Sequence, residues 1–135
     1  MLLYSGSGPA LASYRLSQRV RGLTDCAKAC GEASRDLTSR LVPGPDGPAR
    51  ARLMRGLEAA RDCAELCSTA AALMGRASEL TPLALLACAE ACRRCVDECE
   101  SLPVNDAAIA CVALCRRGEE ICRQAAGPSG ATALS

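Results

Sequence analysis

The chain has 135 residues, which is enough for one compact domain with a buried core and too few for two ordinary domains. Its formal charge is +1, and its fifteen Arg and one Lys are interspersed with acids, so no basic stripe could follow a nucleic-acid backbone. Half of the residues are hydrophobic, yet Trp, Phe and His are absent and only two residues are Tyr, so the core must consist of Leu, Ala, Val and Cys.

Proline and glycine divide the chain into four segments rich in Ala, Leu, Arg and Glu, which are good helix formers. The predicted helices cover residues 16–41, 48–76, 82–100 and 106–126, and the ends, residues 1–14 and 127–135, are expected to be loosely ordered. We expect Thr81 to cap the third helix ahead of Pro82, Asn105 or Asp106 to cap the fourth, and Gly127 to end it. The short connections predict an all-α, up-down-up-down antiparallel four-helix bundle.

The compartment decides how the eleven cysteines are used. The segment after Met1 lacks the basic start and the roughly 7–15 apolar residues of a secretory signal, and Arg or Glu interrupts every apolar stretch before the roughly 20 residues of a membrane span. We therefore expect a soluble cytoplasmic protein, where thiols stay reduced and clustered cysteines usually serve metal or redox chemistry.

The cysteines recur at helical spacing. They are Cys26 and Cys30 in the first predicted helix, Cys63 and Cys67 in the second, Cys88, Cys92, Cys95 and Cys99 in the third, and Cys111, Cys115 and Cys122 in the fourth. Ten of the eleven have another cysteine three or four residues away, a spacing that places side chains on one helix face and, as a 4-3-4 rhythm, on the seam that points into a bundle. Gly118 occupies the seam position at which the fourth helix would carry a further cysteine.

Antiparallel packing predicts a thiol column roughly 20 Å long. We name as the near end of the bundle the end where the first and third helices begin and the second and fourth helices end. An apolar plug should close the opposite, far end, and its expected members are Leu37, Leu41, Leu53, Leu57, Leu102 and Ile109. The near end is expected to be more open, and Met74 beside it could serve either as a thioether ligand or as core filling.

The thiols could be structural, but Leu or Ala would fill a bundle core without the risk of oxidation. Disulfides within a helix are disfavoured, because Cβ atoms four residues apart lie about 5–6 Å from each other and a disulfide needs roughly 3.5–4.5 Å. A metal ion between two sulfurs spans about 4–5 Å. Soft thiolates select Cu(I), zinc or iron–sulfur clusters, and one monovalent ion per thiolate would leave the column near neutral. Cu(I) is therefore the favoured ion.

The segment Cys88-Ala-Glu-Ala-Cys92-Arg-Arg-Cys95-Val-Asp-Glu-Cys99, flanked by helices with further C-x₃-C pairs, resembles the copper storage proteins over about residues 17–126. This resemblance implies a four-helix bundle that holds many Cu(I) ions, with all eleven cysteines as ligands, and a homo-oligomer that is commonly a tetramer. The chain would be a divergent member, since it lacks the His that cytosolic members often carry near the bundle mouth.

We therefore expect a cytoplasmic, non-enzymatic protein that stores or buffers multiple Cu(I) ions, through the eleven cysteines and Met74. Its expected partners are copper ions and a copper chaperone or a low-molecular-weight thiol, with no nucleic acid and no membrane. Two alternatives stay open: a redox or metal-cluster enzyme that uses buried dithiols, and a zinc-binding or structural helical interaction module.

Overall fold

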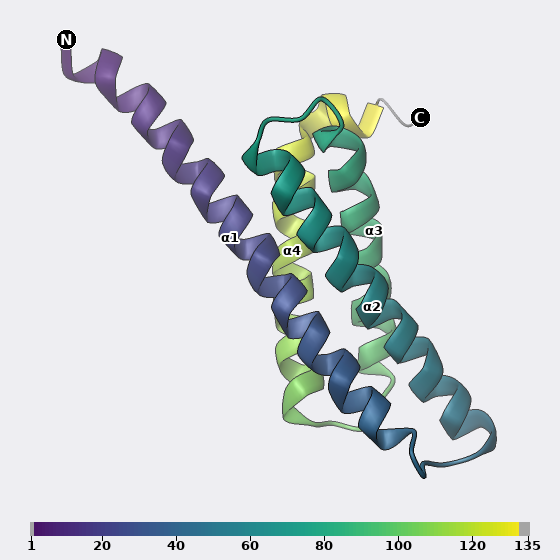
Figure 1. Ribbon diagram of the computed structural model, residues 1–135. Helices are drawn as coiled ribbons and strands as arrows, with labels where there is room; N and C mark the ends of the chain where they lie inside the picture. Colours follow the sequence, from purple (N-terminus) through teal and green to yellow (C-terminus); the bar gives the residue numbers. More distant parts are fainter. Residues whose placement is uncertain (1, 133–135) are drawn as a thin grey trace.

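The protein is a bundle of four helices. The computed structural model describes the backbone of residues 2–132 and the side chains of residues 10–127, so the expectations for Met1 and for residues 133–135 fall outside it. The helices are α1 (Leu2–Arg40), α2 (Gly47–Gly75), α3 (Thr81–Glu100) and α4 (Asp106–Thr132) (Figure 1). No strand occurs among the described residues, which confirms the predicted all-α class.

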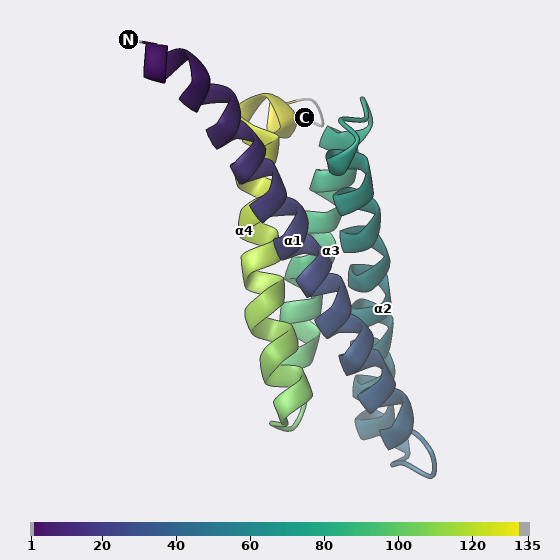
Figure 2. The ribbon, with the colours of Figure 1, turned by 60° about the vertical axis from the view of Figure 1, so that its left-hand side comes forward.

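Successive helices run in opposite directions, as the short loops predicted (Figures 1 and 2). Helix α1 packs against α2 and α4, and α3 packs against the same two helices, so the four form a closed ring of neighbours around one axis. This arrangement brings the seams of all four helices to that axis. Within the part of the chain that is described, no helix combines the length and apolarity that crossing a membrane requires.

The helix ends confirm one of the predicted caps and correct another. The Asn105 side-chain oxygen accepts a hydrogen bond from the Ala108 backbone N–H at 2.9 Å, which confirms Asn105 as the cap of α4. The prediction for Thr81 is wrong, because its hydroxyl donates to the Ser78 carbonyl at 2.6 Å and the residue that precedes α3 makes no side-chain cap. Gly127, with φ of 63°, interrupts α4 where its end was predicted, and further helical residues follow it.

Helix α1 begins earlier than predicted, at Leu2 instead of residue 16. Residues 10–17 contain neither proline nor glycine, so nothing in that stretch stops the helix. Figures 1 and 2 show this part of α1 projecting past the other helices. Its described side chains are exposed, with Leu11 56 % and Tyr14 62 % accessible. The N-terminal part of α1 is thus an arm outside the bundle core.

Five leucines form the predicted plug at the far end of the bundle. Its buried members are Leu37, Leu41, Leu53, Leu57 and Leu102. Ile109 was assigned to this plug incorrectly, since it is 56 % exposed. The physical reason is helical phase: Ile109 lies two residues before Cys111, and residues two apart point to different sides of a helix.

The near end is closed, contrary to the expectation that it would be more open. Leu23, Leu85, Ile121 and Met74 are all buried there, with 7 % exposure or less. Gly22 lies directly against the end of the Ile121 side chain, which leaves no room for a β-carbon at that point and allows α1 and α4 to approach closely. Apolar layers therefore cover the thiols at both ends.

Candidate metal centre

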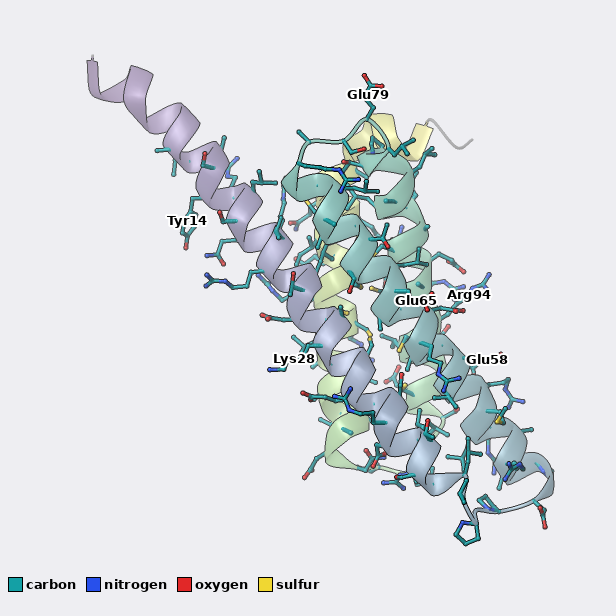
Figure 3. The ribbon with its side chains drawn as sticks, viewed as in Figure 1. Tyr14, Lys28, Glu58, Glu65, Glu79 and Arg94 are labelled. Atoms are coloured by element: carbon teal, nitrogen blue, oxygen red, sulfur yellow. The ribbon has the colours of Figure 1, made fainter. Side chains whose placement is uncertain are left out.

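All eleven cysteines are free thiols and face the inside of the bundle. None is more than 3 % exposed, and ten are fully buried. The 4-3-4 spacing places them on the inner faces of their helices, so the predicted inward orientation is confirmed. Figure 3 shows sulfur atoms between the ribbons in the middle of the bundle, whereas the labelled Lys28, Glu58 and Arg94 lie on its outside.

Sulfur contacts cross between the helices at several levels. The shortest joins Cys67 on α2 to Cys88 on α3 at 3.3 Å between Sγ atoms, and the next joins Cys30 on α1 to Cys115 on α4 at 3.4 Å. The Sγ atoms of Cys63 and Cys115 meet across the bundle axis at 3.7 Å. Each helix therefore contributes sulfur to one shared interior.

The contacts join ten cysteines into a single column. Its members are Cys26, Cys30, Cys63, Cys67, Cys88, Cys92, Cys95, Cys99, Cys111 and Cys115. Cys122 is equally buried but makes no sulfur contact among the described side chains. It is also the one cysteine without another three or four residues away, so its separation is visible in the sequence.

Within the column, three sets of four Sγ atoms lie within 4.8 Å of one another and could each hold a metal ion. We call them the near group (Cys26, Cys63, Cys67, Cys92), the central group (Cys26, Cys30, Cys63, Cys115) and the far group (Cys30, Cys95, Cys111, Cys115). Each group draws on at least three helices, so it exists only in the folded bundle. Cys88 and Cys99 extend the column at its two ends, at 3.3 Å from Cys67 and 3.9 Å from Cys95.

The sequence was compared with models of known protein families. The family model described as copper storage protein matches residues 15–127, a region that contains every cysteine. The chain belongs to the copper storage protein family. Among curated proteins, none matches the chain.

Gly118 lets α4 approach the thiols closely. A β-carbon at this position would lie 3.1 Å from Cys92 Sγ and 3.2 Å from Cys26 Sγ, which is closer than such atoms ordinarily pack. The sequence identified Gly118 as a gap in the cysteine seam. It did not show that sulfur atoms of two other helices fill the gap, because that depends on how the helices pack.

Hydrogen bonds among the thiols shift their pKa values in different directions. The bond with Cys115, followed by those with other thiols, lowers the pKa of Cys26, and the bond with Cys111 does the same for the pKa of Cys95. The bond with Cys111, together with burial, raises the pKa of Cys30. The thiols of the column therefore differ in how readily they give up a proton, and the thiolate is the form that binds metal.

Apart from the thiols, the described part of the bundle interior contains no charged group. Among the described residues, no polar or charged side chain is buried. Any negative charge that the thiolates acquire must then be balanced by the bound ions or by retained protons, because burying an isolated charge is costly. Met74 is 7 % exposed and belongs to the same core cluster as the thiols.

Proposed function

We propose that this protein is a single-domain, cytoplasmic store for several Cu(I) ions and that it acts without catalysing a reaction. The continuous column of buried thiols from four helices, in a member of the copper storage protein family, carries this proposal. The proposed ligands are all eleven cysteines, with the Met74 thioether as a further ligand at the near end.

Two features favour the monovalent, reduced form of copper. Thiolate is a soft ligand and selects Cu(I) over harder ions. The core also lacks a buried cation, so one Cu(I) per thiolate leaves a nearly neutral column, whereas a divalent ion held by four thiolates leaves two negative charges. The reducing cytoplasm would keep both the metal and the thiols in the required state.

Copper is the proposed cargo, and its donor would be a copper chaperone or a low-molecular-weight thiol that exchanges the ion by ligand substitution. We also propose a homotetramer, an assembly that the family resemblance suggests. Light scattering of the reduced protein, with and without copper, measures the mass of the assembly. A monomer in both states would remove the tetramer from the proposal and leave the metal column unaffected.

Anaerobic titration with Cu(I) against a competing chelator tests the storage function. We expect several tightly bound equivalents per chain, counted by metal analysis. The double substitution Cys92→Ser and Cys95→Ser should remove several of them, because each serine replaces a thiol that contacts other members of the column. Val96→Ala is the matched control, since it changes a buried residue of the same helix that carries no sulfur, and it should retain the wild-type count.

Fewer than about two equivalents, or a preference for zinc or iron over copper, would reject the storage proposal and favour a cluster enzyme or a zinc module. The two peripheral ligands are tested separately. Met74→Leu keeps the side-chain volume and Cys122→Ser removes a thiol outside the column. Each should weaken the last copper equivalents, and an unchanged titration would remove that residue from the ligand set.

A further inference from the structure

The three four-thiol groups overlap in an ordered way. The central group shares Cys26 and Cys63 with the near group, and Cys30 and Cys115 with the far group. The near and far groups share no thiol. The column is thus a row of three sites in which only the two outer ones can be filled without competing for ligands.

Several sulfur–sulfur distances in the near and far groups match those around a tetrahedral ion. Metal–sulfur bonds of about 2.3 Å in tetrahedral geometry place neighbouring sulfurs about 3.8 Å apart. In the near group, the Sγ atom of Cys63 lies 3.8 Å from that of Cys67 and 3.6 Å from that of Cys92. In the far group, the Sγ atom of Cys111 lies 3.5 Å from that of Cys95 and 3.9 Å from that of Cys115. The thiols that these contacts join already have the spacing of tetrahedral ligands.

The charge of the ion sets the electrostatic cost of filling adjacent groups together. Two ions on either side of a shared pair of sulfurs would lie about 2.6 Å apart if the bonds are about 2.3 Å long. The repulsion between two dications at that distance is four times that between two monocations. Monovalent ions therefore occupy adjacent groups at a lower electrostatic cost, and for two divalent ions the near and far groups, which share no ligand, are the pair with the least repulsion.

We propose that the column has a second loading mode, in which two divalent ions of the zinc type bind tetrahedrally, one in the near group and one in the far group, and the central group stays empty. Each ion binds four thiolates, the protons that those thiols still hold are released to solvent, and no oxidation or reduction takes place. Each filled group keeps two negative charges in a core without a buried cation, so this mode is weaker than copper loading and Cu(I) displaces the divalent ions. This inference rests on the proposed function only in that both require the buried thiols to bind metal.

Co²⁺ is a suitable probe, because tetrahedral thiolate coordination gives it intense visible absorption and sulfur-to-metal charge-transfer bands. Anaerobic titration of the reduced full-length chain should saturate at two Co²⁺ per chain. Zn²⁺ should then bleach the visible bands with the same stoichiometry, and Cu(I) should bleach them more strongly at equal concentration. Val96→Ala again provides the control and should retain both ions.

Three variants test the overlap of the groups. Cys67→Ala disables only the near group and Cys95→Ala only the far group, so each should halve the visible absorbance to one Co²⁺ per chain. The double variant Cys67→Ala/Cys95→Ala leaves all four thiols of the central group in place. It should therefore still bind one ion, and adding Cys26→Ala should abolish that binding.

Three or more tetrahedral Co²⁺ ions in the wild type would overturn the proposal, and so would a double variant that keeps its helical circular dichroism but binds none. If the double variant does not fold, the single variants decide the question. The proposal of two independent outer sites is contradicted if both single variants still bind two ions. It is also contradicted if either single variant remains folded but binds no ion. A wild type that binds Cu(I) in several equivalents and no Co²⁺ refutes this mode alone. Failure to bind either metal would refute the storage function as well.

Discussion

At the scale of single residues, side-chain size governs how closely the helices meet. Cysteine is small enough for ten sulfurs to share the bundle axis, and α4 has no side chain at Gly118, where the sulfurs of Cys26 and Cys92 lie against it. The inward direction of the cysteines was predictable because helical phase is a local property. The role of Gly118 was not, because it depends on side chains from other helices.

Gly118→Ala is expected to destabilise the reduced, metal-free protein. A methyl group at 3.1 and 3.2 Å from two sulfurs overpacks the core, which lowers the free energy of unfolding by about 1–3 kcal/mol. The higher helix propensity of alanine offsets about 1 kcal/mol of this loss. A net loss of up to about 2 kcal/mol should appear in anaerobic urea unfolding.

Gly31→Ala is the control for this substitution. Its β-carbon would lie 3.8 Å from the nearest atom, a nitrogen of the Arg35 side chain, so only the gain in propensity of about 1 kcal/mol should remain. Equal stabilisation by both substitutions would show that the thiols relax freely around position 118.

At the scale of helices, the positions of helix-breaking proline and glycine residues predicted the boundaries of α2 and α3 to within about one residue. The sequence failed where an end depends on tertiary packing or on competing hydrogen bonds. Thr81 turns its hydroxyl to the Ser78 carbonyl instead of capping α3. The near end was expected to be more open than the far end, but Leu23 of α1 and Ile121 of α4 are buried there.

Closure of the near end predicts that it limits the rate of metal entry. Ile121→Ala removes the side chain that abuts Gly22 and should accelerate the transfer of Cu(I) from a chelator several-fold, measured by stopped-flow absorbance, with the number of bound ions unchanged. Leu57→Ala makes a comparable cavity in the far plug, and both substitutions are expected to cost about 2–5 kcal/mol of stability. Similar acceleration by both variants would indicate that copper enters through global unfolding, and no acceleration by Ile121→Ala would place the entry route elsewhere.

At the scale of the whole molecule, binding and folding use the same contacts. The bundle topology was predictable, since short loops between long helices leave few other arrangements. The division of the column into three overlapping groups was not, because it requires the rise and rotation of all four helices relative to one another. Each group takes ligands from at least three helices, so a metal ion bound there holds those helices together.

Copper should therefore raise the thermal stability of the protein. A ligand that binds only the folded state at 100 times its dissociation constant adds about 2.7 kcal/mol per site, which corresponds to an increase of several degrees in the melting temperature. Anaerobic thermal unfolding followed by circular dichroism measures this, and removal of the metal by a strong chelator should reverse it. An unchanged melting temperature at full loading would mean that copper binds unfolded chains equally well.

The N-terminal arm places the start of the chain away from the thiol column. The part of α1 before residue 15 adds a helical spacer of roughly 20 Å, and the first cysteine, Cys26, lies well beyond it. A linker, affinity tag or electrode attachment joined to this arm would hold the bundle at a distance from its sulfur atoms. Devices that immobilise the protein for metal capture can thus use this end without altering the core.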